Sequence, residues 1–285
     1  FSGGKGLGDF RAEMLQDKHL RKIVDYADNE ALFSNVSIVG GVNYFLWDSS
    51  YNGDCEVTSI RGENAVTLNR DLSEYDIFIR NNNALQLIRR MEASGDRKMD
   101  DVVYPRNVFG ISSDLRGQDN KDEKHQLALF SSQKSNSMAM SYISGDEVQK
   151  QHELIGKYKV IMGKVVPRGG EVGVDPSVGY RVTSTLQVLS PGSVFTDSYL
   201  LLAAFDSKAE AIHFAEYMCL KFPRFLLHET YSSMNISKQN FRFVPFLDYS
   251  KEWTDKELFK RYGCNEEEIS MIESIIRPME YVFHE

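Results

Sequence analysis

The sequence lacks the features that would place it in a membrane or in an oxidising compartment. No apolar run approaches the ~20 residues needed to span a bilayer, and the longest, 199–205, has only the length of a strand. The three cysteines are odd in number and far apart, so they indicate no disulfide framework. The first residues are rich in glycine and carry charges, unlike the apolar core of a signal peptide. We therefore expect a cytoplasmic protein that makes no membrane contact.

Several motifs of catalysis and metal binding are also absent. The histidines show neither the HxxxH nor the HExxH spacing of a zinc site, and no Gly-x-Ser-x-Gly elbow offers a serine nucleophile. No Glu-x-Lys pair occurs, and Asp-x-Lys pairs such as those at Asp96, Asp119 and Asp206 lie in polar stretches typical of loops. The glycine-rich segment 1–6 is similar to a nucleotide loop, but no strand precedes it and the Walker pattern is lacking. We expect no metal site, no cofactor site and no catalytic residue in this chain.

The charge balance is acidic overall but uneven along the chain. The net charge of −8 argues against a nucleic-acid partner when taken alone, because basic patches are the usual footprint. Residues 150–242, however, hold eleven Lys and Arg against eight Asp and Glu, whereas residues 246–285 hold five against ten. A solvated acidic helical face explains the second segment equally well.

The first third of the chain predicts helices around a strand-rich meander. Residues 9–25 carry an apolar stripe at helical spacing, and Asn83 can cap a second helix that contains Leu85, Ile88 and Met91. Strands are predicted at 38–46, 55–60, 65–68 and 77–79. The Asn-Gly turn within 51–54 predicts a hairpin between the first two strands, and a turn at 61–64 joins the next pair.

Beyond the polar stretch 94–101, which we interpret as a domain boundary, the pattern is mainly β with long loops. Strands are predicted at 127–130, 138–143, 158–162, 185–188 and 199–205. The loops 109–126 and 167–180 are long enough to be functional or disordered. The fold class is therefore α+β, with one domain at 1–93 and a second at 94–285.

The C-terminal part predicts three helical segments. The first covers 208–227, where Pro223 predicts either a kink or the start of a new helix at Phe222. A capping box formed by Thr254 and Glu257 opens the second, which Gly263 ends in a left-handed conformation. A further box formed by Asn265 and Glu268 opens the third.

Polar and cationic side chains gather in segments that could contact DNA. Lys and Arg neutralise phosphates, while Arg, Asn and Gln can read guanine and adenine edges with two hydrogen bonds. Such residues also occur on ordinary surfaces, so the clusters alone do not single out DNA. The candidate contacts are Arg106, Asn107, Arg116, Lys157, Lys159, Lys164, Arg168, Arg181, Asn235, Lys238, Gln239 and Arg242.

Several sequence blocks resemble, in order, the C-terminal part of type II (type IIG-like) restriction–modification adenine-N6 DNA methyltransferases. FSGGKGLGDFRAEML and DYADNEALFSNVSIVGGVNYFLWD are similar to the end of the methylase domain. PRNVFGISSDLRG, YKVIMGKV, LSPGSVFTDSYLLLAAFDSKAEA, KFPRFLLH, FRFVPFLDYSKEWTD and LFKRYGCNEEEISMIESIIRPM are similar to the target-recognition region. The resemblance implies that 1–93 ends a Rossmann-like methyltransferase sheet and that 94–285 is an α+β recognition domain with a helical C-terminus.

One departure from that family decides what we expect of this chain. The catalytic Asn-Pro-Pro-Tyr tetrapeptide is absent, and Asn107 is not followed by proline. The flipped adenine needs a pocket beside the methyl donor, which the recognisable parts of this chain do not supply. The resemblance thus implies that the chain selects a DNA sequence, while S-adenosylmethionine and the methyl transfer belong to a parent enzyme of a bacterial restriction–modification system.

The expected partners are double-stranded DNA and the methylase half that lies outside this sequence. Because the first strands should extend a larger sheet, they leave an exposed edge through which a homodimer could form. Two alternatives remain open, a stand-alone specificity subunit and a protein-interaction domain that uses the apolar C-terminal helices. Sequence-dependent DNA binding separates the first from the second.

Overall fold

The computed structural model describes residues 7–27, 32–33, 41–132, 140–165, 179–231 and 235–279, and it has the α+β composition that the sequence predicts. No helix among these residues is long and apolar enough to cross a bilayer. The helices are α1 (Gly8–Gln16), α2 (Leu85–Ala93), α3 (Lys208–Tyr217), α4 (Lys221–His228), α5 (Asp255–Arg261) and α6 (Glu266–Ile275). The strands are β1 (Leu20–Tyr26), β2 (Val42–Trp47), β3 (Cys55–Arg61), β4 (Asn64–Arg70), β5 (Leu127–Phe130), β6 (Ser141–Ile143), β7 (Tyr158–Gly163), β8 (Leu186–Leu189), β9 (Ser193–Phe195) and β10 (Tyr199–Phe205).

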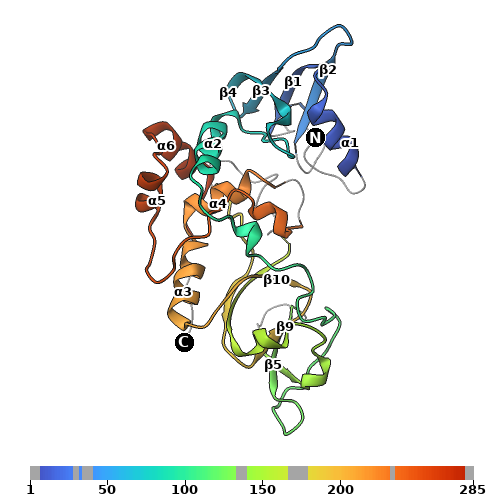
Figure 1. Cartoon of the computed structure of the whole chain (residues 1–285), viewed down its shortest axis with the longest axis vertical. Coiled ribbons are helices and arrows are strands. Elements are labelled where there is room, and N and C mark those ends of the chain that lie inside the picture. Colours follow the sequence, from blue (N-terminus) through green and yellow to red (C-terminus); the bar gives the residue numbers. More distant parts are fainter. Residues whose placement is uncertain are drawn as a thin grey trace.

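The N-terminal part is a four-stranded mixed sheet in the order β2-β1-β3-β4. Strand β1 pairs antiparallel with β2 and parallel with β3, so Ile23 lies between Phe45 and Val57. Leu15 of α1 joins Ile23 and Val57 in a small buried core. Figure 1 shows this sheet and α1 at one end of the molecule.

Two predictions for this sheet are wrong. The helix predicted over 9–25 ends at Gln16, and Leu20–Tyr26 is a strand whose Ile23 is fully buried. The Asn-Gly turn does not make a hairpin, because β1 lies between β2 and β3. Pairing between segments far apart in sequence overrides both local patterns.

The hairpin predicted at 61–64 is confirmed, because β3 and β4 pair antiparallel up to Arg61↔Asn64 and Gly62 has a φ of 57°. Residues 77–79 form no strand. The helix α2 is present, but Asn83 does not cap it: its N-cap is Ala84, which has no capping side chain. Asn81 instead caps the preceding 3-10 helix Asn82–Ala84 and accepts a hydrogen bond from the Asn83 N–H at 3.2 Å.

The middle of the chain forms two three-stranded sheets, ordered β10-β7-β8 and β6-β5-β9. The predicted strands at 127–130, 158–162, 185–188 and 199–205 are confirmed within a residue at each end. Strand β6 begins at Ser141, and 138–139 lie outside the described residues. Strand β9 was missed because Ser193–Phe195 is short. Figure 1 shows these strands at the opposite end of the molecule from α1.

The helix predicted over 208–227 is two helices. α3 ends at Tyr217 and α4 begins at Lys221, so the new start that Pro223 predicts is confirmed one residue earlier than Phe222. Pro223 is the third residue of α4, where its missing N–H removes no helical hydrogen bond. The capping boxes of α5 and α6 are confirmed, and Gly263 between them has a φ of 60°.

The largest hydrophobic core joins α2 to the C-terminal helices. Leu87 and Ile88 of α2 belong to one buried cluster with Leu200 of β10, Phe222 of α4 and Ile272 of α6. This cluster contains residues from both sides of residue 93. The domain boundary predicted there stays a prediction. A second core beneath β5, β9 and β10 supports the loops described next.

Candidate nucleic-acid interface

Three segments meet at the end of β7, and two of them contain predicted DNA contacts. Lys164 follows β7, and its carbonyl accepts a hydrogen bond from the Ile236 N–H at 2.8 Å. Val165 forms an isolated bridge with Asn235. The N–H of Lys164 donates to Ser198 O at 3.1 Å in the turn between β9 and β10. We name this meeting point, Lys164, Asp197 and Asn235, the β7 edge.

The centre of the β7 edge is an ion pair that the sequence did not predict. Lys164 Nζ lies 2.8 Å from Asp197 Oδ2, and the lysine side chain is only 14% exposed. Asp197 Oδ1 and the neighbouring Thr196 Oγ1 are buried and have no hydrogen-bond partner. A buried acceptor without a donor costs roughly 1–3 kcal/mol, so this turn carries an unfavourable contribution to folding.

The loop that starts at Arg106 reaches the same edge. Ile111 O accepts the Asp197 N–H at 3.0 Å, which fixes the loop against the turn. Asn107 has a φ of 56°, and its Oδ1 is buried without a partner. Arg106 and Arg116 are exposed. Hence the loop that carries these three candidates is joined to the β7 edge through Ile111.

The segment 235–242 continues the edge in the other direction. Asn235 is exposed, and Lys238–Phe241 form a short 3-10 helix (η7) that Ser237 and Asn240 close with a capping box. Gln239 is exposed, whereas Arg242 forms an ion pair with Asp76 and donates from Nε to Gln239 O.

Lys157 and Lys159 do not belong to this edge. Strands β7 and β10 run antiparallel, with Tyr158 opposite Phe205 and Gly163 opposite Tyr199, so Lys157 is at the far end, roughly 20 Å from Lys164. Lys157 pairs there with Asp206. The two ends of β7 thus carry matched lysine–aspartate pairs.

The prediction that Lys159 contacts DNA is corrected by its burial. Its side chain has no exposed surface, and Nζ donates to the carbonyls of Lys157 at 2.6 Å and Leu154 at 3.1 Å. Burial lowers the pKa of Lys159 to about 8. The ammonium ties β7 to the preceding 3-10 helix η5 (His152–Gly156) and is not available to a phosphate.

Two candidates remain, Arg168 and Arg181. Arg168 lies outside the described residues. Arg181 is half-buried, its Nε has no partner, and its carbonyl accepts from Arg224 Nη1 at 3.0 Å. The preceding Tyr180 bridges to Ile276 just after α6, so Arg181 is held against the C-terminal helices.

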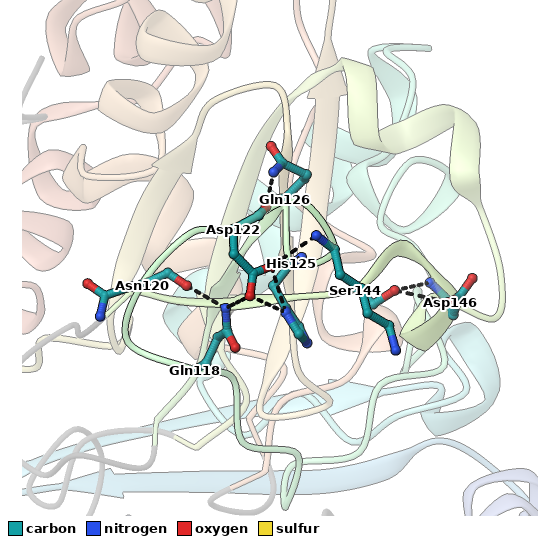
Figure 2. A network of polar contacts seen from close by, with 8 residues as sticks. Gln118, Asn120, Asp122, His125, Gln126, Ser144 and Asp146 are labelled. Carbon is teal, nitrogen blue, oxygen red and sulfur yellow. Dashed lines mark hydrogen bonds and ion pairs between the residues drawn. The ribbon is translucent and has the colours of Figure 1, made fainter.

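The charged loop after Arg116 is ordered by a carboxylate that the sequence did not single out (Figure 2). Asp122 accepts hydrogen bonds from Gln118 Nε2 at 2.8 Å and from the backbone N–H groups of His125 at 2.7 Å and Lys124 at 2.9 Å. The Gln118 side chain, followed by the His125 N–H, holds the pKa of Asp122 well below its usual range. Gln118 also exchanges two backbone hydrogen bonds with Tyr142, which anchors the loop to β6.

Neither a metal centre nor a catalytic constellation emerges from these contacts. Among the residues that the structure describes, no three His, Cys, Asp or Glu side chains are grouped to hold a metal ion. The β7 edge offers an amide, a lysine–aspartate pair and an unpaired carboxylate oxygen. That set can bind by hydrogen bonding.

Comparisons with known proteins add one structural likeness. No family model matches the chain, and no curated protein matches it. Among solved structures, the chain is similar to the type IIG restriction endonuclease BpuSI, with 10% sequence identity and a TM-score of 0.36. The alignment covers 92% of this chain and 40% of that enzyme, so the chain spans less than half of its length. At this TM-score the likeness assigns neither a fold nor a function.

Proposed function

We propose that this chain is the DNA sequence-recognition part of a site-specific adenine-N6 methyltransferase of a restriction–modification system. The observation that carries the proposal is the β7 edge, where Lys164, Asp197 and Asn235 from three segments meet. The ordered resemblance of sequence blocks to the target-recognition region supports it. In this proposal S-adenosylmethionine and methyl transfer belong to the parent enzyme.

The side chains at the edge offer complementary means of recognition. Asn235 and Gln239 carry exposed amides, which can pair with the N6 and N7 positions of adenine. The Asp197 carboxylate accepts hydrogen bonds only, so it favours the N4 amino group of cytosine or the N6 amino group of adenine over a phosphate. Arg116 is exposed and suits a phosphate.

The test is fluorescence anisotropy on a randomised duplex pool, followed by sequencing of the bound fraction. We expect an enriched short motif. Lys164→Ala should weaken binding to that motif at least fivefold, because it removes a donor and leaves Asp197 without its counter-charge. Lys157→Ala is the matched control, since it breaks the same kind of ion pair at the other end of β7.

Two results would contradict the proposal. If the chain binds no duplex at low salt, the DNA function fails. If it binds without enrichment of any motif, the chain holds phosphates but does not select a sequence by itself. Equal losses in Lys164→Ala and Lys157→Ala would remove the β7 edge from the interface.

A protein-interaction domain is the second candidate, and one observation favours it. Strand β2 is the outer strand of its sheet, and four consecutive side chains, Tyr44, Phe45, Leu46 and Trp47, are about half exposed. An outer strand with this much apolar surface is prone to pair with another chain. Sedimentation over a range of concentrations tests the predicted homodimer. A monomer throughout that range would contradict it.

A further inference from the structure

A groove runs between the other outer strand of the N-terminal sheet, β4, and the helix α6. It consists of two adjoining cavities of about 620 and 460 Å³. Val66 of β4, Asn83, and Glu267 and Met271 of α6 line both. Figure 1 shows α2 and α6 beside the β4 end of this sheet. The groove is separate from the β7 edge.

One wall of the groove is β4, the outer strand of the sheet. β4 pairs with β3 alone, and no other described strand lies on its outer side. Asn64, Ala65 and Val66 line the first cavity, and Val66 and Leu68 line the second. This stretch of β4 is roughly 13 Å long, the length of four to five extended residues. An extended peptide can add to such an edge through backbone hydrogen bonds.

Donors with weak or missing partners line the same space. Asn81 is only 1% exposed, yet its Nδ2 reaches Glu229 Oε1 at 3.4 Å and Met271 Sδ at 3.5 Å, both long contacts. Arg61 Nε is buried and has no hydrogen-bond partner. Both groups can donate to a carbonyl oxygen, which an extended backbone supplies at every residue.

The charges along the groove favour a basic occupant. Arg90 is bonded to Glu268 at 2.5 Å, and the charge of Arg61 acts on the buried carboxylate of Glu229. Glu266 and Glu267 are exposed and form no ion pair with any residue in the described part of the chain. Arg90 is therefore paired, and Arg61 forms no ion pair among the described residues. Three glutamates against two arginines leave the lining of the groove with a net negative charge.

We propose that this groove binds an extended basic polypeptide segment of a partner protein. The segment adds to the outer edge of β4, and its Lys or Arg side chains contact Glu266 and Glu267. DNA does not suit the site, because its phosphates would face these carboxylates. The proposal does not depend on the DNA function.

The test uses the full chain and fluorescein-labelled pentapeptides of sequence KVKVK and EVEVE in a polarisation titration. We expect saturable binding of KVKVK, with EVEVE at least tenfold weaker. A Glu266→Gln, Glu267→Gln double variant should bind KVKVK at least tenfold more weakly than the native chain. Both positions are exposed, and the capping box of Asn265 and Glu268 stays intact. Glu210→Gln is the matched control, since it removes an acid from the first turn of α3, away from the groove.

N-methylated peptides test the strand pairing itself. In an added strand, only every second residue directs its backbone N–H towards the edge of β4. Methyl groups on these amides should abolish binding, whereas methyl groups on the other amides should be tolerated. Four outcomes overturn the proposal. They are the absence of saturable KVKVK binding, equal binding of KVKVK and EVEVE, no effect of the double variant, and equal tolerance of both N-methyl sets.

Discussion

Replacement of Arg224 by methionine should destabilise the protein more than any surface substitution. Its side chain has no exposed surface, and its guanidinium donates to four backbone carbonyls. Nε bonds Cys219 O and Leu220 O, both at 3.0 Å, Nη1 bonds Arg181 O at 3.0 Å, and Nη2 bonds Arg277 O at 2.9 Å. One side chain thus connects the start of α4 to two segments distant in sequence.

The expected loss follows from two opposing contributions. Methionine fills a similar volume but leaves four carbonyls without their donor, at roughly 1.5–2 kcal/mol each. Burial lowers the pKa of Arg224 to about 10, which means that the folded state already bears a desolvation cost for this charge of roughly 3 kcal/mol. Removing the charge recovers that cost. The net decrease in the free energy of unfolding is about 3–5 kcal/mol.

Urea and thermal unfolding followed by circular dichroism measure this decrease. For a chain of this size it corresponds to a fall in melting temperature of roughly 10 °C. Arg89→Met is the control, because Arg89 makes a partly exposed ion pair with Glu74 and should contribute less than about 1 kcal/mol. If Arg224→Met shifts the midpoint no more than Arg89→Met, the carbonyl cluster does not hold these segments together.

Three further substitutions test other parts of the fold. Burial lowers the pKa of Lys159 to about 8 in the folded chain, so above pH 8 the unfolded chain binds more protons than the folded chain does. Between pH 8 and 10.5 the free energy of unfolding of the native chain should therefore rise relative to that of Lys159→Met, by at most about 3 kcal/mol. Paired urea titrations at about pH 7.5 and 9.5 measure this difference. Thr254→Ala should lower the free energy of unfolding by about 1 kcal/mol, measured by thermal unfolding, because α5 loses its N-capping side chain. Gly110→Ala should lower the free energy of unfolding by about 1–3 kcal/mol, since φ is +74° and the new Cβ would lie 2.7 Å from Gln149 Cβ. Gly62→Ala has open space around it and should lower the free energy of unfolding less in the same assay.

Elements whose cause lies within a few residues could be predicted from the sequence. The box of Thr254 and Glu257 needs only a hydroxyl and a carboxylate three positions apart, and the hairpin at Gly62 needs only a turn between two apolar runs. The strand that contains Ile23 could not be predicted in this way. Its neighbours Phe45 and Val57 are distant in sequence, and the same residues also fit a helical stripe.

The candidate site shows the same limit. Lys157 and Lys164 are close in number, but the strand between them carries them to opposite ends of β7. Asp197, which holds Lys164, has no sequence signal beyond its place in a polar turn between two apolar runs. Charge clusters in a sequence therefore indicate which side chains are available, and only the direction of the strands decides which of them share a surface.

The ion pairs also determine how salt should affect DNA binding. Lys157, Lys164 and Arg242 are each held by an aspartate, whereas Arg106, Arg116 and Lys238 form no ion pair with any residue in the described ranges. Each phosphate that a cation neutralises contributes about −0.9 to the slope of log affinity against log salt, so three unpaired cations predict a slope of about −3. Arg116→Gln should reduce that slope by about one, whereas Lys164→Ala should lower affinity and leave the slope unchanged, because Asp197 already balances its charge. A slope steeper than about −4 would refute this reasoning, since the paired cations would then have exchanged their carboxylates for phosphates.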